Sequence, residues 1–166
     1  MNKSGIPFEK IGFVLARVIM GAVFLYASYD KILHPGAFAE AVYNYQILPE
    51  AAVNAVALVL PWIELVVGLC LVAGVWLPGG TLLAASLMAV FTAALVFNRI
   101  RGLDVHCGCF STQTTHGPAG VGTVLRDLGF LVLSVYLLLR VLIFSQDRAR
   151  PAGAPFHKKT CQGVKE

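Results

Sequence analysis

The sequence IGFVLARVIMGAVFLYASY, residues 11–29, decides the fold of this chain. It is an apolar run whose only charged residue is Arg17, and its length is close to the ~20 residues that a helix needs to cross a ~30 Å hydrocarbon core. The apolar region of a cleaved signal peptide is shorter, about 7 to 15 residues. We therefore expect this run to be retained as the first membrane span.

Three further apolar runs follow, at about residues 51–77, 81–97 and 124–144, with Pro78-Gly79-Gly80 as a turn between the first two of them. Of the 166 residues, 57 % are hydrophobic and 13 % are charged, whereas soluble domains average about 25 % charged residues. So few polar residues cannot cover a soluble protein, which leaves contact with lipid as the explanation. We predict an all-α fold, a polytopic membrane protein with an antiparallel four-helix transmembrane bundle.

The connection between the first two spans, residues 30–50, contains turn signals and aromatic side chains. His34-Pro35-Gly36 and Pro49 interrupt any continuous helix. Between them, residues 37–47 carry aromatic side chains that suit the boundary between lipid and water. We expect a short interfacial helix in this first outer loop.

Four spans put both ends of the membrane domain, residues 11–145, on the same side of the bilayer. The arm before it (1–10) has two lysines, and the tail after it (146–166) is strongly basic, with Arg148, Arg150, Lys158, Lys159 and Lys165. Because positively charged segments stay in the cytoplasm, we expect a multi-pass protein of the bacterial inner (plasma) membrane with both termini cytoplasmic. Outside the tail no basic stripe with interleaved aromatic residues occurs, which argues against nucleic acid as a partner.

Two cysteines separated by one glycine, Cys107-Gly108-Cys109, stand in the connection between the third and fourth spans. Gly108 allows the bend that brings the two sulfurs together, since a disulfide needs Cα atoms about 4.4 to 6.8 Å apart. Strained or exposed disulfides are easily reduced, and closing so short a loop stabilises a fold little. The pair therefore predicts redox chemistry, with reduced thiols in a loop as the open alternative.

The neighbours of the two thiols could tune their chemistry. A thiol reacts as its thiolate, and nearby cations lower its pKa, so His106 and Arg101 are the candidates for this role in catalysis. A zinc or copper site is an alternative, because nitrogen and sulfur ligands suit both metals. Its spacing is unlike that of the usual zinc knuckle, and we assign no metal to the candidate set, which is His106, Cys107, Cys109 and His116.

Charged residues also occur inside the spans, where they are costly and usually face the bundle interior in pairs. Arg17 and Glu64 are offset by roughly one helical turn, on the order of 5 Å, and we expect them to pair. Together with Pro61, which should kink the second span, they predict a polar site for a small molecule such as a quinone; the alternative is a pair that only fixes helix packing. Arg126, at the outer start of the fourth span, could bind headgroups, an anion or a thiolate.

These residues recur in one family pattern: Arg17 with Gly21, Lys31 with His34-Pro35, Leu60-Pro61-Trp62-Ile63-Glu64 with Gly68, Asn98, Arg101-Gly102, Cys107-Gly108-Cys109-Phe110 and Arg126-Asp127. On them the chain, over about residues 10–145, resembles the DoxX-like superfamily of four-span membrane proteins, and within it the MauE (methylamine utilisation) branch. Ser111 stands where that branch usually has glycine, a change of one small residue for another.

The resemblance implies an accessory role. MauE proteins act with thioredoxin-like partners in the disulfide-dependent maturation of a periplasmic amine dehydrogenase, and other DoxX-like proteins are tied to thiosulfate oxidation with quinone. We therefore expect an inner-membrane thiol/disulfide redox protein whose periplasmic Cys107 and Cys109 serve a thioredoxin-like protein. Two alternatives stay open, a non-enzymatic scaffold subunit and a thiosulfate:quinone oxidoreductase component. Whether the protein is an enzyme, as a thiol-disulfide or quinone-linked oxidoreductase, is therefore undecided at this point.

Overall fold

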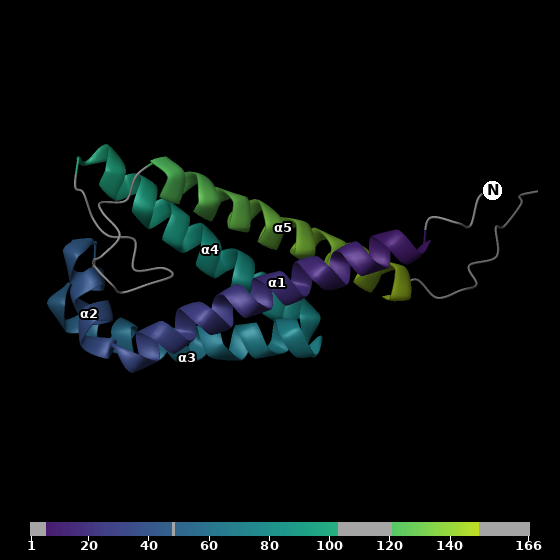
Figure 1. The fold of residues 1–166 in the computed structure, drawn as a ribbon, viewed down its shortest axis with the longest axis horizontal. Coiled ribbons are helices and arrows are strands. Elements are labelled where there is room, and N and C mark those ends of the chain that lie inside the picture. The colour runs from purple at the N-terminus through teal and green to yellow at the C-terminus, as the bar shows by residue number, and fades with distance from the viewer. Residues whose placement is uncertain (1–5, 48, 103–120, 150–166) are drawn as a thin grey trace, which may run out of the picture.

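The computed structural model describes residues 6–47, 49–102 and 121–149, and all regular structure among them is helical. The helices are α1 (Ile6–Leu33), α2 (Pro35–Asn44), α3 (Glu50–Ala73), α4 (Leu77–Ile100) and α5 (Val121–Ala149) (Figure 1). The predicted all-α bundle is confirmed, and the short helix expected in the first connection is α2, with Pro35 in its first turn.

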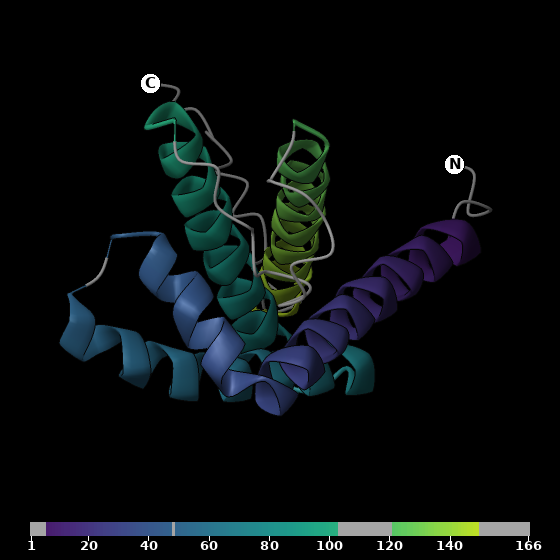
Figure 2. The ribbon, with the colours of Figure 1, turned by 60° about the vertical axis from the view of Figure 1, so that its left-hand side comes forward.

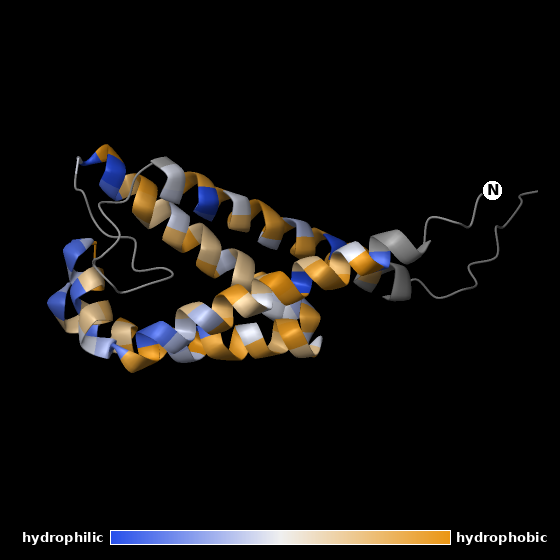
Figure 3. Ribbon diagram, in the orientation of Figure 1, coloured by the Kyte–Doolittle hydropathy of each residue, from blue (hydrophilic) through white to orange (hydrophobic). Residues whose placement is uncertain are grey.

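Four helices are long and apolar enough to cross a membrane, over Lys10–Leu33, Glu50–Ala73, Leu77–Ile100 and Gly122–Phe144. Large apolar side chains cover their outer faces; Leu58, for example, is 67 % exposed and Val132 63 % exposed. Figure 3 shows hydrophobic residues around the long helices and hydrophilic ones gathered mainly at α2 and the helix ends near it. Apolar surface on this scale is suited to lipid, and the chain is a multi-pass membrane protein.

The long helices pack as two pairs, α1 with α3 and α4 with α5, which make the most extensive contacts in the described structure. The two pairs cross, and they diverge toward the end where α2 lies (Figures 1 and 2). α1 begins and α5 ends at the opposite end of the long axis (Figure 1). A core from all four long helices holds the crossing together; its buried members are Met20, Phe24, Val67, Leu71, Ala84, Met88 and Leu137.

Two glycines bring α1 and α3 into close contact. A Cβ atom on Gly21 would lie 2.6 Å from Cγ2 of Val72 and 3.0 Å from the carbonyl oxygen of Gly68. A Cβ atom on Gly68 would lie 2.9 Å from Cγ of Leu25. Small residues at a membrane helix contact let the two backbones approach closely, so these glycines fix how α1 and α3 lie against each other.

The turn between α3 and α4 differs from the expected one. α3 ends at Gly74, whose φ of 75° lies in the left-handed region that glycine tolerates. α4 then begins at Leu77 with Pro78 in its first turn, where a missing N–H group costs nothing. Pro78-Gly79-Gly80 therefore opens α4 rather than forming the turn, which is a correction to the sequence-based prediction.

We expect Gly21→Ala to lower the free energy of unfolding by about 1–3 kcal/mol, the usual cost of overpacking a tight contact. Thermal unfolding of the purified protein in detergent measures the effect. Gly12→Ala is the matched control, because it lies on the same helix and a Cβ there has nothing within 4 Å. Equal melting temperatures for the two variants would contradict the proposed contact.

Candidate functional site

A buried ion pair joins α1 to α3. The Nζ atom of Lys31 lies 2.6 Å from Oε1 and 2.7 Å from Oε2 of Glu64, and it donates hydrogen bonds to both. Each side chain is only 1 % exposed. Charges in this environment are stable only when they are paired, so the pair holds the two helices in one register.

The Lys31 ammonium also contacts aromatic rings from two other helices. Nζ lies 5.1 Å from the ring centroid of Phe38 on α2 and 5.2 Å from that of Phe91 on α4. Cations within about 6 Å of a ring centroid are attracted to the ring. Lys31 is therefore the point at which α1, α2, α3 and α4 meet.

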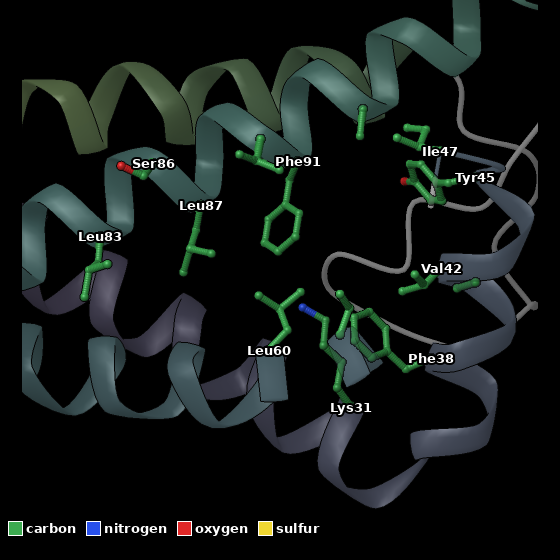
Figure 4. Close-up of a pocket in the computed structure, with 14 residues that line it drawn as sticks. Lys31, Phe38, Val42, Tyr45, Ile47, Leu60, Leu83, Ser86, Leu87 and Phe91 are labelled. Atoms are coloured by element: carbon green, nitrogen blue, oxygen red, sulfur yellow. The ribbon is translucent and has the colours of Figure 1, made fainter. Parts of the chain in front are cut away.

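A cavity of about 410 Å³ opens beside this point, between α2, the first half of α3 and the middle of α4. Lys31 is the only charged residue lining it among the residues that the structure describes. The close-up in Figure 4 shows its nitrogen directed into the space between Leu60, Phe38 and Phe91. Most of the remaining wall is aliphatic, with Tyr45 and Ser86 as the neutral polar residues.

The expected pair between Arg17 and Glu64 does not form, because Glu64 pairs with Lys31. Arg17 lies instead at the end of α3, where a Cβ on Gly74 would collide with its guanidinium group. Its Nε atom is buried and has no hydrogen-bond partner in the described part of the chain. A cation beside the C-terminal end of a helix interacts favourably with the helix dipole, so Arg17 has a structural role at a separate place.

The register of the two helices explains this correction. α1 and α3 run antiparallel, and Gly21 packs against Gly68. Moving back along α3 from Gly68 to Glu64 therefore means moving forward along α1, toward Lys31 and away from Arg17. The sequence-based prediction ended the first span at Tyr29, which left Lys31 in a loop, whereas α1 continues to Leu33.

Pro61 and Glu64 do not line the cavity, but each lies next to a residue that does. Pro61 is buried inside α3, next in sequence to Leu60, which lines the cavity. Glu64 reaches the cavity through Lys31. Of the four residues predicted to bind a cofactor, these two lie near the cavity, and Arg17 and Arg126 are not among its lining residues.

Two other predicted residues lie where α4 ends and α5 begins. Arg101 follows α4, is exposed, and has its guanidinium carbon 5.4 Å from the ring centroid of Phe97. Arg126, in the first turns of α5, donates hydrogen bonds from Nε and Nη2 to Oδ1 of Asp127, both at 3.2 Å. Asp127 is buried, so Arg126 compensates the charge of a carboxylate inside the bundle.

The predicted residues His106, Cys107 and Cys109 lie outside the described residues, as does His116 of the alternative metal set. Their segment, 103–120, connects the end of α4 to the start of α5, and both of these helix ends lie toward the α2 end of the bundle (Figure 1). Among the residues that are described, no group of three or more His, Cys, Asp or Glu side chains could hold a metal ion.

Asn98, near the end of α4, is a buried polar residue to which the sequence analysis assigned no role. It is completely buried in the last turns of α4, and neither its Nδ2 nor its Oδ1 atom has a hydrogen-bond partner in the part of the chain that is described. A buried amide without partners is costly. An asparagine directly after an apolar run gave no signal of this burial, because the sequence placed it at the end of a span.

We expect Lys31→Met to lower the free energy of unfolding by about 3–5 kcal/mol, because it leaves the Glu64 carboxylate buried and unpaired. The double variant Lys31→Met/Glu64→Met should recover most of this loss, since it removes both charges. Unfolding in detergent across the double-mutant cycle measures the coupling. Lys10→Met, the same substitution at an exposed position of α1, is the control; additive losses from the two single variants would argue against the pair.

Comparisons with known proteins identify relatives of this chain. The family described as "Methylamine utilisation protein MauE" matches residues 9–140. The methylamine utilization protein MauE of Paracoccus denitrificans is 35 % identical over 120 residues, which cover 72 % of this chain and 64 % of that protein. The MauE protein of Methylophilus methylotrophus is 30 % identical over 125 residues, covering 75 % of this chain and 66 % of that protein.

The chain thus spans just under two thirds of the length of the curated relatives it matches. No solved structure is significantly similar to it. The family match covers most of the four-span domain, including the segment with Cys107 and Cys109 and the Lys31–Glu64 pair. On this evidence the chain belongs to the MauE family.

Proposed function

We propose that this protein is a membrane-bound thiol/disulfide redox factor that serves methylamine utilisation, as the names of its relatives indicate for them. The observation that carries the proposal is the position of Cys107 and Cys109 in the connection between two membrane-spanning helices. A connection between spans lies outside the hydrocarbon core, so a water-soluble thiol protein can reach it.

Charge at both ends of this connection supports the proposal. Arg101 stands at the end of α4 and Arg126 near the start of α5, with Arg101 exposed. Arginines near a thiol favour the thiolate, which is the form that attacks a disulfide. Arg126 is engaged with Asp127, so Arg101 is the better candidate for this role.

The orientation follows from the same charge count that the sequence provides. The tail after α5 contains Lys158, Lys159 and Lys165, and basic segments of this kind stay in the cytoplasm. The opposite end of the bundle, with α2 and the cysteine connection, then faces the periplasm. Disulfides persist in that compartment, and the partner we propose there is a thioredoxin-like protein.

The exchange needs only sulfur chemistry. A thiolate of the partner attacks one sulfur of the Cys107–Cys109 disulfide, which breaks the S–S bond and releases the other cysteine as a thiolate. The second partner thiolate then attacks the mixed disulfide. The partner leaves with a new disulfide, and Cys107 and Cys109 are left reduced by the same two electrons. The reverse sequence reduces the partner.

The redox couple of the two cysteines tests this function. We expect Cys107 and Cys109 to form a reversible couple between about −120 and −270 mV, the range of thiol–disulfide oxidoreductases. Alkylation of free thiols in membranes equilibrated with a glutathione series measures it, in a Cys70→Ala/Cys161→Ala background that removes the other two cysteines.

Methylamine-dependent growth tests the same proposal in cells. Cys107→Ser and Cys109→Ser should each abolish methylamine-dependent growth and accumulate a mixed disulfide with the partner. Cys70→Ala should leave growth unchanged, because Cys70 is a free, partly buried thiol inside α3. A pair that never changes redox state, or growth that survives both serine variants, would refute the proposal and favour a scaffold subunit.

A further inference from the structure

We propose that the guanidinium group of Arg17 binds the phosphate of an anionic phospholipid, on the side of the membrane opposite α2. The site is formed by α1 and by the turn between α3 and α4. With both termini in the cytoplasm, as proposed, this side is the cytoplasmic leaflet, which carries anionic lipids. The site is independent of the thiol/disulfide function, because Cys107 and Cys109 lie in the connection between α4 and α5.

Arg17 is a partly buried cation that has no carboxylate partner among the described residues. Its Nε atom is buried and has no acceptor in that part of the chain. Most of the described acidic side chains lie in α2 or near the helix ends on its side (Figure 1), and Glu64 is already engaged by Lys31. These acidic residues are Asp30, Glu40, Glu50, Glu64 and Asp127. A charge inside a membrane span needs compensation, and none of these residues supplies it to Arg17.

The position of Arg17 places its charge near the membrane surface. The guanidinium group lies beside Gly74, where α3 ends, and α4 begins three residues later at Leu77. The spans in α3 and α4 contain 24 residues each, which corresponds to about 36 Å of helix and exceeds the ~30 Å hydrocarbon core. The turn between them therefore lies where the lipid head groups begin. Trp76, which is 72 % exposed in this turn, is a side chain typical of that boundary.

The donors available at this turn suit a phosphate. Because Nε of Arg17 is buried, Nη1 and Nη2 are the nitrogens left to donate, and a guanidinium fork can bind two oxygens of one phosphate. The C-terminal end of α3 favours the cation. The first N–H groups of α4 favour an anion, and its N-cap residue Trp76 makes no side-chain capping hydrogen bond to them.

The unpaired charge selects an anionic lipid over a zwitterionic one. Phosphatidylglycerol carries one net negative charge, which compensates the charge of Arg17. Phosphatidylcholine brings its own cation together with its phosphate and leaves the total charge of the site unchanged. Exposed apolar side chains follow Arg17 toward the middle of the span, including Val18 and Ile19, and these are suited to contact the acyl chains of the same lipid.

Competition for a fluorescent phosphatidylglycerol tests the site. The full chain is measured in detergent at about 0.15 M salt, which screens attraction to distant basic residues. We expect unlabelled phosphatidylglycerol to displace the probe at a mole fraction about 5-fold lower than phosphatidylcholine, the effect of one basic side chain at an anionic head group. Inorganic phosphate, which has no acyl chains, should not displace the probe. Equal displacement by the two lipids, or displacement by inorganic phosphate, would overturn the lipid assignment.

Two substitutions on α1 locate the head group. Arg17→Gln should remove the preference for phosphatidylglycerol, because it removes the charge and the guanidinium fork. Lys10→Gln is the matched control; it removes a charge from an exposed position seven residues earlier on the same helix and should leave the preference unchanged. A preference that persists in Arg17→Gln, or an equal loss in both variants, would contradict the site. The comparison of the two lipids on the parent protein decides the proposal even where Arg17→Gln fails to fold.

Discussion

The buried ion pair between Lys31 and Glu64 is the interaction on which the arrangement of the helices depends. A lone charge inside a membrane bundle is far less favourable than a charge in water, so each of these residues requires the other. The close contact of Gly21 with Gly68 brings α1 and α3 near enough for the pair to form. The same ammonium lies against rings from α2 and α4, so one cation connects four helices.

The helix content of the fold was predictable because the bilayer fixes the length of each span. Four apolar runs became four long helices, and Pro35 with the aromatic residues after it became α2. The helix boundaries were less predictable. Charged residues normally end a span, yet α1 continues past Asp30 and Lys31, because Lys31 finds its partner inside the bundle. α3 ends at Gly74 because the backbone there is left-handed. The sequence alone did not distinguish a turn at Gly74 from a turn at Pro78-Gly79-Gly80.

The site was predictable in its residue types but not in its pairings. Arg17 was the only cation within the predicted first span, whereas the partner of Glu64 is Lys31, two residues beyond the predicted end of that span. Counting residues from the ends of a span gives depth, but it does not give the register between two helices. The register follows from the glycine contact, which appears only when both helices are placed side by side. Cys107 and Cys109, in contrast, are distinctive in sequence alone, because few connections between spans carry two thiols so close together.

The buried ion pair also lies beside the cavity that α2, α3 and α4 enclose. The two helix pairs diverge toward α2 (Figures 1 and 2), and the Lys31 ammonium lies against the rings of Phe38 on α2 and Phe91 on α4. The same two rings line the cavity, so the residues that enclose the buried charge also form part of the wall of the space beside it.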